Sequence, residues 1–302
     1  MSKSRIARGD RINGVLLLDK PGGLTSNSAL QTARRLLGAA KAGHTGTLDP
    51  MATGLLPITF GEATKFSADL LDADKSYRAT IRLGVTTTTG DADGDVIETR
   101  EVDVARAEVD VALAQYVGAI DQVPPMHSAL KRDGQPLYKL ARAGATVERA
   151  ARRITIHRLM LIEHVADSIT VDVDCSKGTY VRVLAEEIGR ALGCGAHLSA
   201  LRRTRAGRLS LDGAVTLPEL EAMTLEERRA HLLPQDELLA SLEIVRLDDT
   251  LAERFRLGQR LALEAEPRGH RVRVYGGTNE LLGTATISEW GVVEPERLIA
   301  NN

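Results

Sequence analysis

The sequence predicts an α+β fold, in which a larger part built on a mixed or antiparallel sheet is followed by a small β domain. First, strand and helix patterns alternate up to about residue 240 without the strict β-α-β order of a doubly wound sheet. Second, several runs have period-two hydrophobicity, which is typical of half-buried strands. Third, segment 245–302 contains short apolar runs separated by Gly-containing turns. We place the boundary within 234–244, which predicts domains at 1–240 and 245–302.

Composition limits the classes of protein to consider. Of the 302 residues, 43% are hydrophobic and 26% are charged, as in ordinary globular proteins. Aromatic residues make up only 3%, so aliphatic side chains must fill most of the core. No apolar run approaches the ~18 residues of a membrane span, and the start MSKSRIARGDRING lacks the apolar core of a secretion signal. We therefore expect a cytoplasmic protein.

The elements of the N-terminal part can be taken in order. The run GVLLLDK, which starts at Gly14, is predicted to be a buried strand, and the turn PGGLTSNS leads into a helix. Ser28 and Gln31 have the spacing of a capping box, and Gly38 is placed to end the helix. The residues expected on its buried face are Leu30, Ala33, Leu36 and Leu37.

The middle of the chain mixes the two periods. LLPITF is predicted as a strand and EATKFSADLLDA as a helix. From Tyr77 to Leu83 apolar and polar residues alternate, which indicates a half-buried strand. VDVARAEVDVALAQYVG is predicted as a helix, and ITIHRLMLIEH and SITVDVDCS as two alternating strands.

The remaining elements complete the two parts. TYVRVLAEEIGRALG is predicted as a helix that ends at Gly193, and 217–239 is expected to be helical and acidic. The residues expected to face inward on the first helix are Val183, Leu184, Ile188 and Leu192. In the small domain, DDTLAERFRLGQ predicts a short capped helix, and HRVRVYGG, ELLGTATI and VVEPERLIA predict strands.

The run GHTGTLDP at 43–50 fits neither a helix nor a strand. Gly and Pro oppose a helix interior, so we expect a tight loop that brings the backbone close to something. The loop carries His44 and Asp49. In one interpretation Asp49 only hydrogen-bonds the backbone of a turn. In the other it is a reactive carboxylate held over a ligand.

The charge of the chain is polarised, although the formal net charge is only −2. Segment 124–158 has many more Lys and Arg residues than acids, whereas segment 87–117 is strongly acidic. The run PPMHSALKRDGQPLYKLARAG within the basic segment is rich in Pro and Gly and weakly periodic. We expect 124–158 to be a long, mobile excursion that binds a polyanion such as RNA. The alternative is a solvated basic surface.

No residue pattern predicts a metal site. Cys175 and Cys194 lack metal-ligand spacing and lie in apolar surroundings, so we expect buried thiols. The segment DADGDVIE resembles the start of a calcium loop but does not match it. Gly94 comes too early, and the twelfth position is Val102 rather than Glu.

A second candidate site lies in CSKGTYVRVLAEEIG. Tyr180 and Arg182 are carried there into the start of a helix, a position that favours anions, and Arg can hold a carboxylate or a phosphate. The alternative interpretation is a packed tyrosine and a surface ion pair.

Four runs, in this order, resemble the bacterial tRNA pseudouridine-55 synthases. They are NGVLLLDKPGGLTS, GHTGTLDPMATGLLP, CSKGTYVRVLAEEIG and LRRTRAG. The resemblance is strong from Gly14 to Gly207 and includes the basic excursion. The resemblance implies a pseudouridine synthase-like catalytic domain and a PUA-like, RNA-binding C-terminal domain. It also implies that a uridine in the T-loop of tRNA becomes pseudouridine without any metal or other cofactor.

The resemblance also implies roles for individual residues. The essential Asp of the family corresponds to Asp49, and its loop histidine, which displaces or replaces the flipped base, corresponds to His44. Tyr77 matches the tyrosine that stacks on the uracil. The polar pair beside the catalytic Asp matches Tyr180 and Arg182.

Two further positions match the family. Leu201 corresponds to the apolar residue that lines the base pocket, and Lys20 with Pro21 corresponds to a pair that shapes the neighbouring loop. The expected partner is the T-arm of tRNA, with no obligate protein partner, and we expect a monomer.

Two other functions fit parts of the sequence. A tRNA-binding or tRNA-folding protein without catalysis would also have a basic excursion and a small β domain, but it would not require Asp49 with Tyr77, Tyr180 and Arg182. A base-releasing nucleosidase or glycosylase would release free uracil. Hydrolytic glycosidases usually pair two carboxylates, one of which activates water, whereas GHTGTLDP supplies a single carboxylate.

Overall fold

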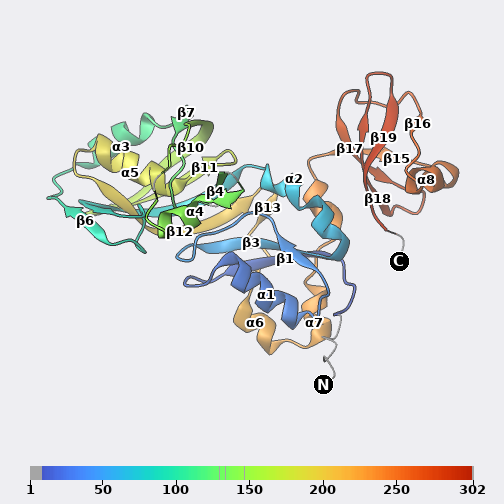
Figure 1. The fold of residues 1–302 in the computed structure, drawn as a ribbon, viewed down its shortest axis with the longest axis horizontal. Coiled ribbons are helices and arrows are strands. Elements are labelled where there is room, and N and C mark those ends of the chain that lie inside the picture. The colour runs from blue at the N-terminus through green and yellow to red at the C-terminus, as the bar shows by residue number, and fades with distance from the viewer. Residues whose placement is uncertain (1–8, 129, 133, 146, 301–302) are drawn as a thin grey trace.

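The computed structural model describes residues 9–128, 130–132, 134–145 and 147–300 (Figure 1). The larger part of the chain is built on one ten-stranded sheet, and the C-terminal part forms a five-stranded sheet. The strands of the large sheet are β1 (Gly14–Lys20), β2 (Ala42–His44), β3 (Thr53–Phe60), β4 (Lys75–Leu83), β7 (Gly118–Gln122), β10 (Arg152–Val165), β11 (Ser168–Cys175), β12 (Ala196–Ala206), β13 (Leu209–Ser210) and β14 (Val215–Thr216). The strands of the small sheet are β15 (Glu243–Arg246), β16 (Leu261–Ala262), β17 (Arg271–Tyr275), β18 (Leu281–Ile287) and β19 (Val292–Leu298).

The large sheet is mixed. Its strand order is β14-β1-β3-β12-β4-β11-β10-β7, with β13 paired to β12 and β2 paired to β3. The β1–β14 and β3–β12 pairs are parallel, whereas β4 pairs in antiparallel register with both β11 and β12. The small sheet has the order β15-β17-β18-β19-β16. The predicted α+β fold with a C-terminal β part is therefore confirmed.

Short strands and helices connect these sheets. The paired short strands are β5 (Val85–Thr87) with β6 (Val96–Thr99), and β8 (Lys131–Arg132) with β9 (Gln135–Pro136). The helices are α1 (Ser26–Leu36), η1 (Gly61–Phe66), α2 (Ser67–Leu71), α3 (Arg106–Ala114), α4 (Leu137–Arg142), α5 (Val181–Ala191), α6 (Leu217–Ala222), α7 (Leu225–Ala230), η2 (Gln235–Leu239) and α8 (Asp249–Arg256). In the described part of the chain, no helix has the length and apolar character needed to cross a membrane.

Helix α1 begins earlier than the sequence predicts. Thr25 is its N-cap, and its Oγ1 accepts a hydrogen bond from the Ser28 amide at 3.0 Å. The capping box predicted at Ser28 and Gln31 is therefore wrong, because Thr25 already satisfies a free amide of the first turn. The predicted end is confirmed: the helix stops at Leu36, and Gly38 follows with φ +65°.

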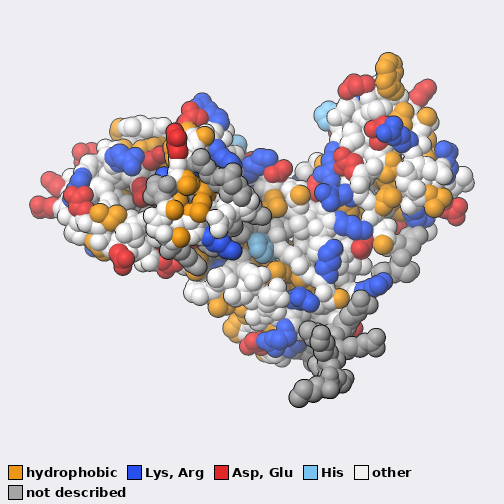
Figure 2. All heavy atoms as spheres, in the orientation of Figure 1, with side chains coloured by type: hydrophobic (Ala, Val, Ile, Leu, Met, Phe, Trp, Pro, Cys, Tyr) orange, Lys and Arg blue, Asp and Glu red, His pale blue; other side chains and the backbone are white. Residues whose placement is uncertain are grey.

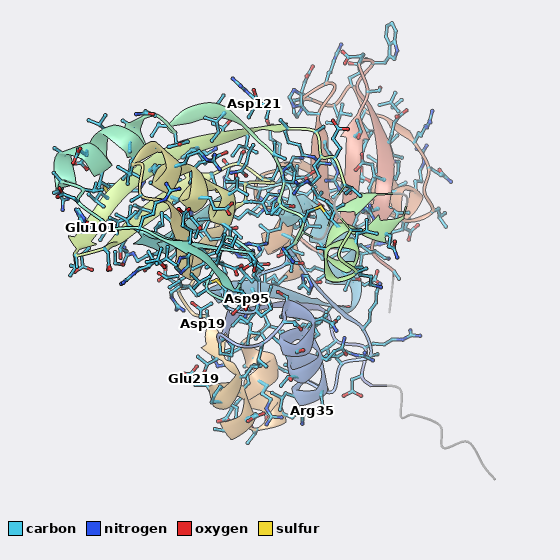
Figure 3. The ribbon with its side chains drawn as sticks, turned by 60° about the vertical axis from the view of Figure 1, so that its left-hand side comes forward. Asp19, Arg35, Asp95, Glu101, Asp121 and Glu219 are labelled. Atoms are coloured by element: carbon cyan, nitrogen blue, oxygen red, sulfur yellow. The ribbon has the colours of Figure 1, made fainter. Side chains whose placement is uncertain are left out.

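Helices cover the large sheet in two groups (Figure 1). α1 and α6 contact each other beside β1, and Figure 3 shows Arg35 of α1 and Glu219 of α6 at the same lower end of the molecule. α3 and α5 lie at the other end, near β10 and β12. On α5, Val181 is buried while Val183 is only half-buried, so the expectation that Val183 faces the core is corrected.

Other predicted helices are shorter or divided. EATKFSADLLDA forms the 3₁₀ helix η1 and then α2, and VDVARAEVDVALAQYVG is helical only over α3. Segment 217–239 forms α6, α7 and η2 rather than one helix. Thr216 and Thr224 are N-caps with complete capping boxes, so the sequence starts a new helix at each of them.

The basic segment between β7 and β10 contains β8, β9 and α4. The expected excursion, 124–158, overlaps the large sheet from Arg152 onward because β10 begins there. Ile154 and Ile156 are buried within that strand, which pairs with both β7 and β11. The alternation of ITIHRLMLIEH correctly predicted this strand.

The small sheet contacts the segment formed by η1, α2 and η2. Arg271 forms ion pairs with Asp69 of α2 and Glu296 of β19. The Lys65 ammonium donates to the Leu298 carbonyl at 2.8 Å. Figure 2 shows a hollow between the two lobes and Lys and Arg side chains gathered beside it.

Candidate active site

The loop that carries Asp49 is fixed by hydrogen bonds to its neighbours. The Thr45 amide donates to the Pro57 carbonyl at 3.1 Å and so ties the start of the loop to β3. Ser26 of α1 makes two bonds with Leu48: its Oγ donates to the carbonyl at 2.9 Å and accepts from the amide at 2.8 Å. These contacts hold the backbone immediately before Asp49 against the start of α1.

Gly46 in the loop and Gly54 in the adjoining strand β3 both have backbone conformations that favour glycine. Gly46 has φ +108°, a conformation that favours glycine because it has no Cβ. Gly54 has φ +97°, and a Cβ there would lie 2.3 Å from the carbonyl oxygen of Arg203. β3 and β12 therefore approach each other closely just beside the loop.

Lys20 fixes the end of the loop through hydrogen bonds to backbone carbonyls. Its side chain is fully buried, and its ammonium donates to the carbonyls of Pro21 at 2.8 Å, Leu24 at 2.7 Å and Pro50 at 3.3 Å. An ammonium has three donors, so all are used. Burial lowers the pKa of Lys20 to about 8, while the nearby Asp49 raises it. Lys20 thus joins the end of β1 to the residue after Asp49.

Asp49 shares one buried guanidinium with a second carboxylate. Arg182, at the start of α5, is 5% exposed, and its Nε lies 3.1 Å from Asp49 Oδ2. Its Nη1 lies 3.2 Å from Oδ2 of the buried Asp91. Carbonyl oxygens of Thr89 and His127 accept the remaining bonds at 3.2 and 2.8 Å. These four partners fix the plane of the guanidinium.

The environment raises the pKa of the Asp49 carboxyl. Burial is the largest cause, the charge of Arg182 opposes it, and Asp91 and Asp93 add to the increase. The side chain of Asp49 nevertheless keeps 37% of its exposure, because it opens into a cavity. Such a group is a carboxylate that takes up a proton more readily than an exposed Asp, which suits a general base or a nucleophile.

Three predicted residues line a cavity of about 340 Å³ together with Asp49. Tyr77 comes from β4, Leu201 from the neighbouring strand β12, and Tyr180 from the N-cap of α5. Burial raises the pKa of Tyr77, and the nearby Arg203 lowers it. The cavity thus has two aromatic rings, an apolar wall and one carboxylate, Asp49, among the described residues that line it.

Gln122 at the end of β7 holds Tyr180 in place. Its Oε1 accepts from the Tyr180 amide at 2.8 Å, and its Nε2 donates to the Tyr180 carbonyl at 3.2 Å. Gln122 is buried, so these two bonds satisfy its amide. A single side chain therefore anchors the start of α5, and with it Arg182.

His44 faces a second cavity, of about 730 Å³, on the other side of Asp49. Thr25, Thr89 and Asp93 also line this cavity. Burial lowers the pKa of His44, and the charge of Arg203 lowers it further. The buried Nδ1 of His44 has no hydrogen-bond partner among the described residues.

The structure brings together all of the residues that the sequence pointed to, and it adds others. Asp49, Tyr77, Tyr180, Arg182 and Leu201 line one cavity, with Lys20 beneath the loop and His44 beyond it. Asp91 was considered only as part of a calcium loop, and Gln122, His127 and Arg203 were not singled out. Their spacing from Asp49 in the sequence carries no local pattern, so only the packing of the sheet reveals them.

Across residues 9–300, apart from the few left out of the description, no three His, Cys, Asp or Glu side chains are placed to hold a metal ion. Cys175 and Cys194 are free and buried, as the sequence predicted.

Comparison with known families gives three matches that together span most of the chain. Residues 34–181 match "TruB family pseudouridylate synthase (N terminal domain)". Residues 182–240 match "tRNA pseudouridylate synthase B C-terminal domain", and residues 244–299 match "Pseudouridine synthase II TruB, C-terminal".

Curated relatives are similar over nearly their whole length. A protein named tRNA pseudouridine synthase B from Burkholderia mallei is 60% identical over 98% of this chain and 97% of its own. Proteins of the same name from Cupriavidus pinatubonensis and Ralstonia pickettii are 58% and 56% identical, each over 95% of this chain and 94% of its own.

Solved structures are similar in fold. "Crystal Structure of a Cbf5-Nop10-Gar1 Complex" matches with a TM-score of 0.74 and 26% identity, over 94% of this chain and 84% of that chain. "Structure of H/ACA RNP bound to a substrate RNA containing 2'-deoxyuridine" matches with a TM-score of 0.73 and 25% identity, over 95% and 85%.

Proposed function

Because the chain belongs to the TruB family of pseudouridylate synthases, we propose that its cavity at Asp49 converts uridine 55 in the T-loop of tRNA into pseudouridine. The enzyme is an isomerase, since substrate and product contain the same atoms. The observation that carries the assignment of the site is that Asp49, held by Arg182 at 3.1 Å, is the single carboxylate among the described residues that line the cavity.

The reaction moves one bond. The N1–C1′ glycosidic bond breaks, the uracil turns, and C5 joins C1′. A site that must rejoin sugar and base has to exclude water. A second carboxylate would activate water for hydrolysis, as it does in glycosidases, so a single carboxylate suits this reaction. Asp49 acts in its ionised form on one of two atoms: it attacks C1′, or it takes the C2′ proton to give a glycal. The Arg182 guanidinium keeps it ionised and oriented in both cases.

The uridine has to leave the tRNA loop to reach Asp49. Extruding a base costs a few kcal/mol, which stacking and hydrogen bonds must offset. Tyr77 offers a stacking face, and Leu201 an apolar wall, in the same cavity. His44 lines the cavity on the far side of Asp49, which supports a contact with RNA at the position the base leaves.

The wider organisation of the chain fits a protein that binds folded RNA. The proposed division is a catalytic domain at 1–240, which includes the basic excursion 124–158, and an RNA-binding β domain at 245–302. The basic residues beside the hollow between the two lobes support a path for the T-arm (Figure 2). Because its proposed substrate is tRNA, we expect the enzyme to act in the cytoplasm, and we expect it to be a monomer.

Nucleotide-resolved detection of pseudouridine in an unmodified tRNA transcript tests this proposal. We expect pseudouridine at position 55 and no free uracil. Free uracil would identify a glycosylase, and tight tRNA binding without any product would identify a tRNA-folding protein. The variant Asp172→Asn is a matched control, because Asp172 pairs with Arg78 away from the cavity and its loss should leave the product yield unchanged.

A further inference from the structure

Arg203 of β12 is the most buried charged side chain among the described residues that line the cavity, and it forms no ion pair with any described carboxylate. Its exposure is 1%, and among the described residues no carboxylate forms an ion pair with it. Arg182 differs, because Asp49 and Asp91 neutralise it. A charge buried without a counter-ion is costly, so a function should account for Arg203.

Backbone carbonyls of two strands hold the guanidinium. Nε donates to the Leu55 carbonyl in β3 at 2.7 Å, and Nη2 donates to the Gly46 carbonyl in the Asp49 loop at 3.1 Å. These bonds satisfy part of the guanidinium without reducing its net charge. They also tie the turn before Asp49 to the sheet.

Arg203 stands directly opposite Tyr77. The two are paired residues of β12 and β4, so their side chains lie on the same face of the sheet. Leu201, two residues earlier on β12, shares this face, and all three line the cavity with Asp49. The guanidinium therefore lies in the wall of the cavity, next to the ring on which we expect the uracil to stack.

The other buried cations of this region cannot replace it. Burial lowers the pKa of both Lys20 and Lys75 to about 8, so each holds its proton less firmly than an ordinary lysine. Their ammonium groups are also fully engaged with backbone carbonyls. An arginine keeps its charge at any physiological pH.

The isomerisation creates a negative charge where that positive charge lies. When the N1–C1′ bond breaks, its electron pair stays with the uracil, which becomes an anion with charge shared among N1, O2 and O4. C5 then bonds to C1′, the C5 proton leaves, and N1 takes up a proton. No oxidant, reductant or co-reactant is needed. A fixed charge in a desolvated site stabilises such an anion without reorganisation.

We infer that Arg203 is a positioning residue of this reaction, which fixes the Gly46 turn and the Tyr77 ring around the base and supplies the positive charge that stabilises the uracil anion. This inference rests on the proposed function. With 1% exposure Arg203 touches the base little, so it acts through Tyr77 and through its field.

The test compares Arg203→Gln and Arg203→Lys in single-turnover reactions with T-arm RNA that carries uridine or 5-fluorouridine at the target position. Fluorine at C5 withdraws electrons and stabilises the uracil anion, so cleavage then depends less on the protein. For uridine, the Gln variant should lose about 10²–10³ in rate, while its Kd for RNA stays within about threefold of wild type. For 5-fluorouridine, measured as loss of the N-glycoside, the loss should be smaller by at least about tenfold.

The Lys variant keeps the charge but not the paired backbone contacts. It should be faster than the Gln variant on uridine by at least about tenfold, and its ratio of 5-fluorouridine to uridine rates should match wild type. Arg205→Gln removes the same charge from an exposed position on β12, beside Ser76 and Asp174, and should leave both rates unchanged.

Two results would overturn the inference. One is a folded Gln variant whose uridine rate stays within about threefold of wild type. The other is an equal loss on both substrates, which would mean that Arg203 only maintains structure. If the Gln variant does not fold, the Lys variant decides, because a raised rate ratio there would contradict a role for the charge. Failure of the proposed function would differ from these results, since wild-type protein itself would then form no pseudouridine.

Discussion

The two sheets of this protein differ in whether their charged side chains are buried or exposed. The charged residues that are buried in the described part of the chain are Lys20, Lys75, Asp91, Arg182 and Arg203. All of them lie in or beside the large sheet. Among the described residues of the small domain, the buried side chains with polar atoms are Thr284 and the Tyr275 hydroxyl, and the core is otherwise aliphatic apart from Phe255.

This difference indicates that the functional site lies in the large sheet and not in the small one. Burying a charge costs several kcal/mol even after relaxation, so a fold that retains several at one place is expected to use them. The small sheet instead places its charges outside, as in the exposed Arg260–Glu294 pair at 3.3 Å, which contributes only about 0–1 kcal/mol. Substitutions of charge should therefore affect chemistry in the first region, and mainly solubility or binding in the second.

The largest effect is expected at Asp49. Asp49→Asn removes the negative charge but keeps the shape, so pseudouridine formation should fall by at least ~10⁴-fold. Affinity for tRNA should change by less than about tenfold, or ~1.4 kcal/mol. Single-turnover assays and a binding titration measure the two quantities. Turnover near the wild-type rate would contradict the proposed contrast between the two sheets, because the buried charges of the large sheet would then have no catalytic role.

Asp91 should give the next largest effect. Asp91→Asn leaves Arg182 with Asp49 as its remaining carboxylate, so the pair should tighten and the rate should fall roughly 10- to 100-fold. The charge of Asp91 raises the pKa of Asp49, after burial as the main cause. Its removal should lower that pKa, and the acidic limb of the pH–rate profile should move to lower pH.

The control for this prediction is Asp172→Asn, which removes a carboxylate that pairs with Arg78 at 2.9 Å outside the cavity. Its profile should match wild type. An acidic limb that stays in place in Asp91→Asn, or moves to higher pH, would show that Asp91 does not influence the protonation of Asp49.

Tyr77 should have a smaller effect, mainly on binding. Tyr77→Phe keeps the ring and should bind T-arm RNA nearly as tightly as wild type. Tyr77→Leu loses the stacking face, worth ~1–3 kcal/mol per base. Equal affinity of the two variants, measured by fluorescence anisotropy, would count against stacking. A slower rate in the Phe variant with binding intact would instead assign the hydroxyl to proton transfer.

The fold was predictable where periodicity decides the structure. The alternation from Tyr77 to Leu83 and the runs HRVRVYGG and ELLGTATI all became strands; the first two bury mainly alternate residues, whereas β18 is buried along most of its length. Helix starts were predicted less well. Thr25 rather than Ser28 caps α1, since several neighbouring residues in PGGLTSNS can cap a helix and only packing selects one.

The site was predictable where a motif is compact and unpredictable where strands assemble it. Asp49 and His44 lie in one loop whose composition is unusual, and Tyr180 and Arg182 lie in another. Arg203 reaches Tyr77 only through the pairing of β12 with β4, which brings together residues far apart in the sequence. No local sequence pattern predicts that pairing, so the place of Arg203 in the cavity could be found only from the structure.

The smallest effect is expected from surface charge. Lys131 and Arg132 lie in β8, and their side chains fall outside the described part of the structure. If the excursion closes on the phosphate backbone, the double variant with both residues changed to Ala should reduce the slope of log affinity against log salt by roughly one to two units, because each phosphate contact releases counterions.

The matched control changes Arg100 and Arg106 to Ala, which removes the same charge from the acidic segment 87–117 and should keep the wild-type slope. Anisotropy titrations of T-arm RNA at several salt concentrations measure both variants. An unchanged slope in the Lys131 and Arg132 variant would mean that these bases only solvate a surface. Charge outside the cavity would then contribute nothing to recognition there, and the contrast between buried and exposed charge would become sharper still, with the Asp49 assignment unaffected.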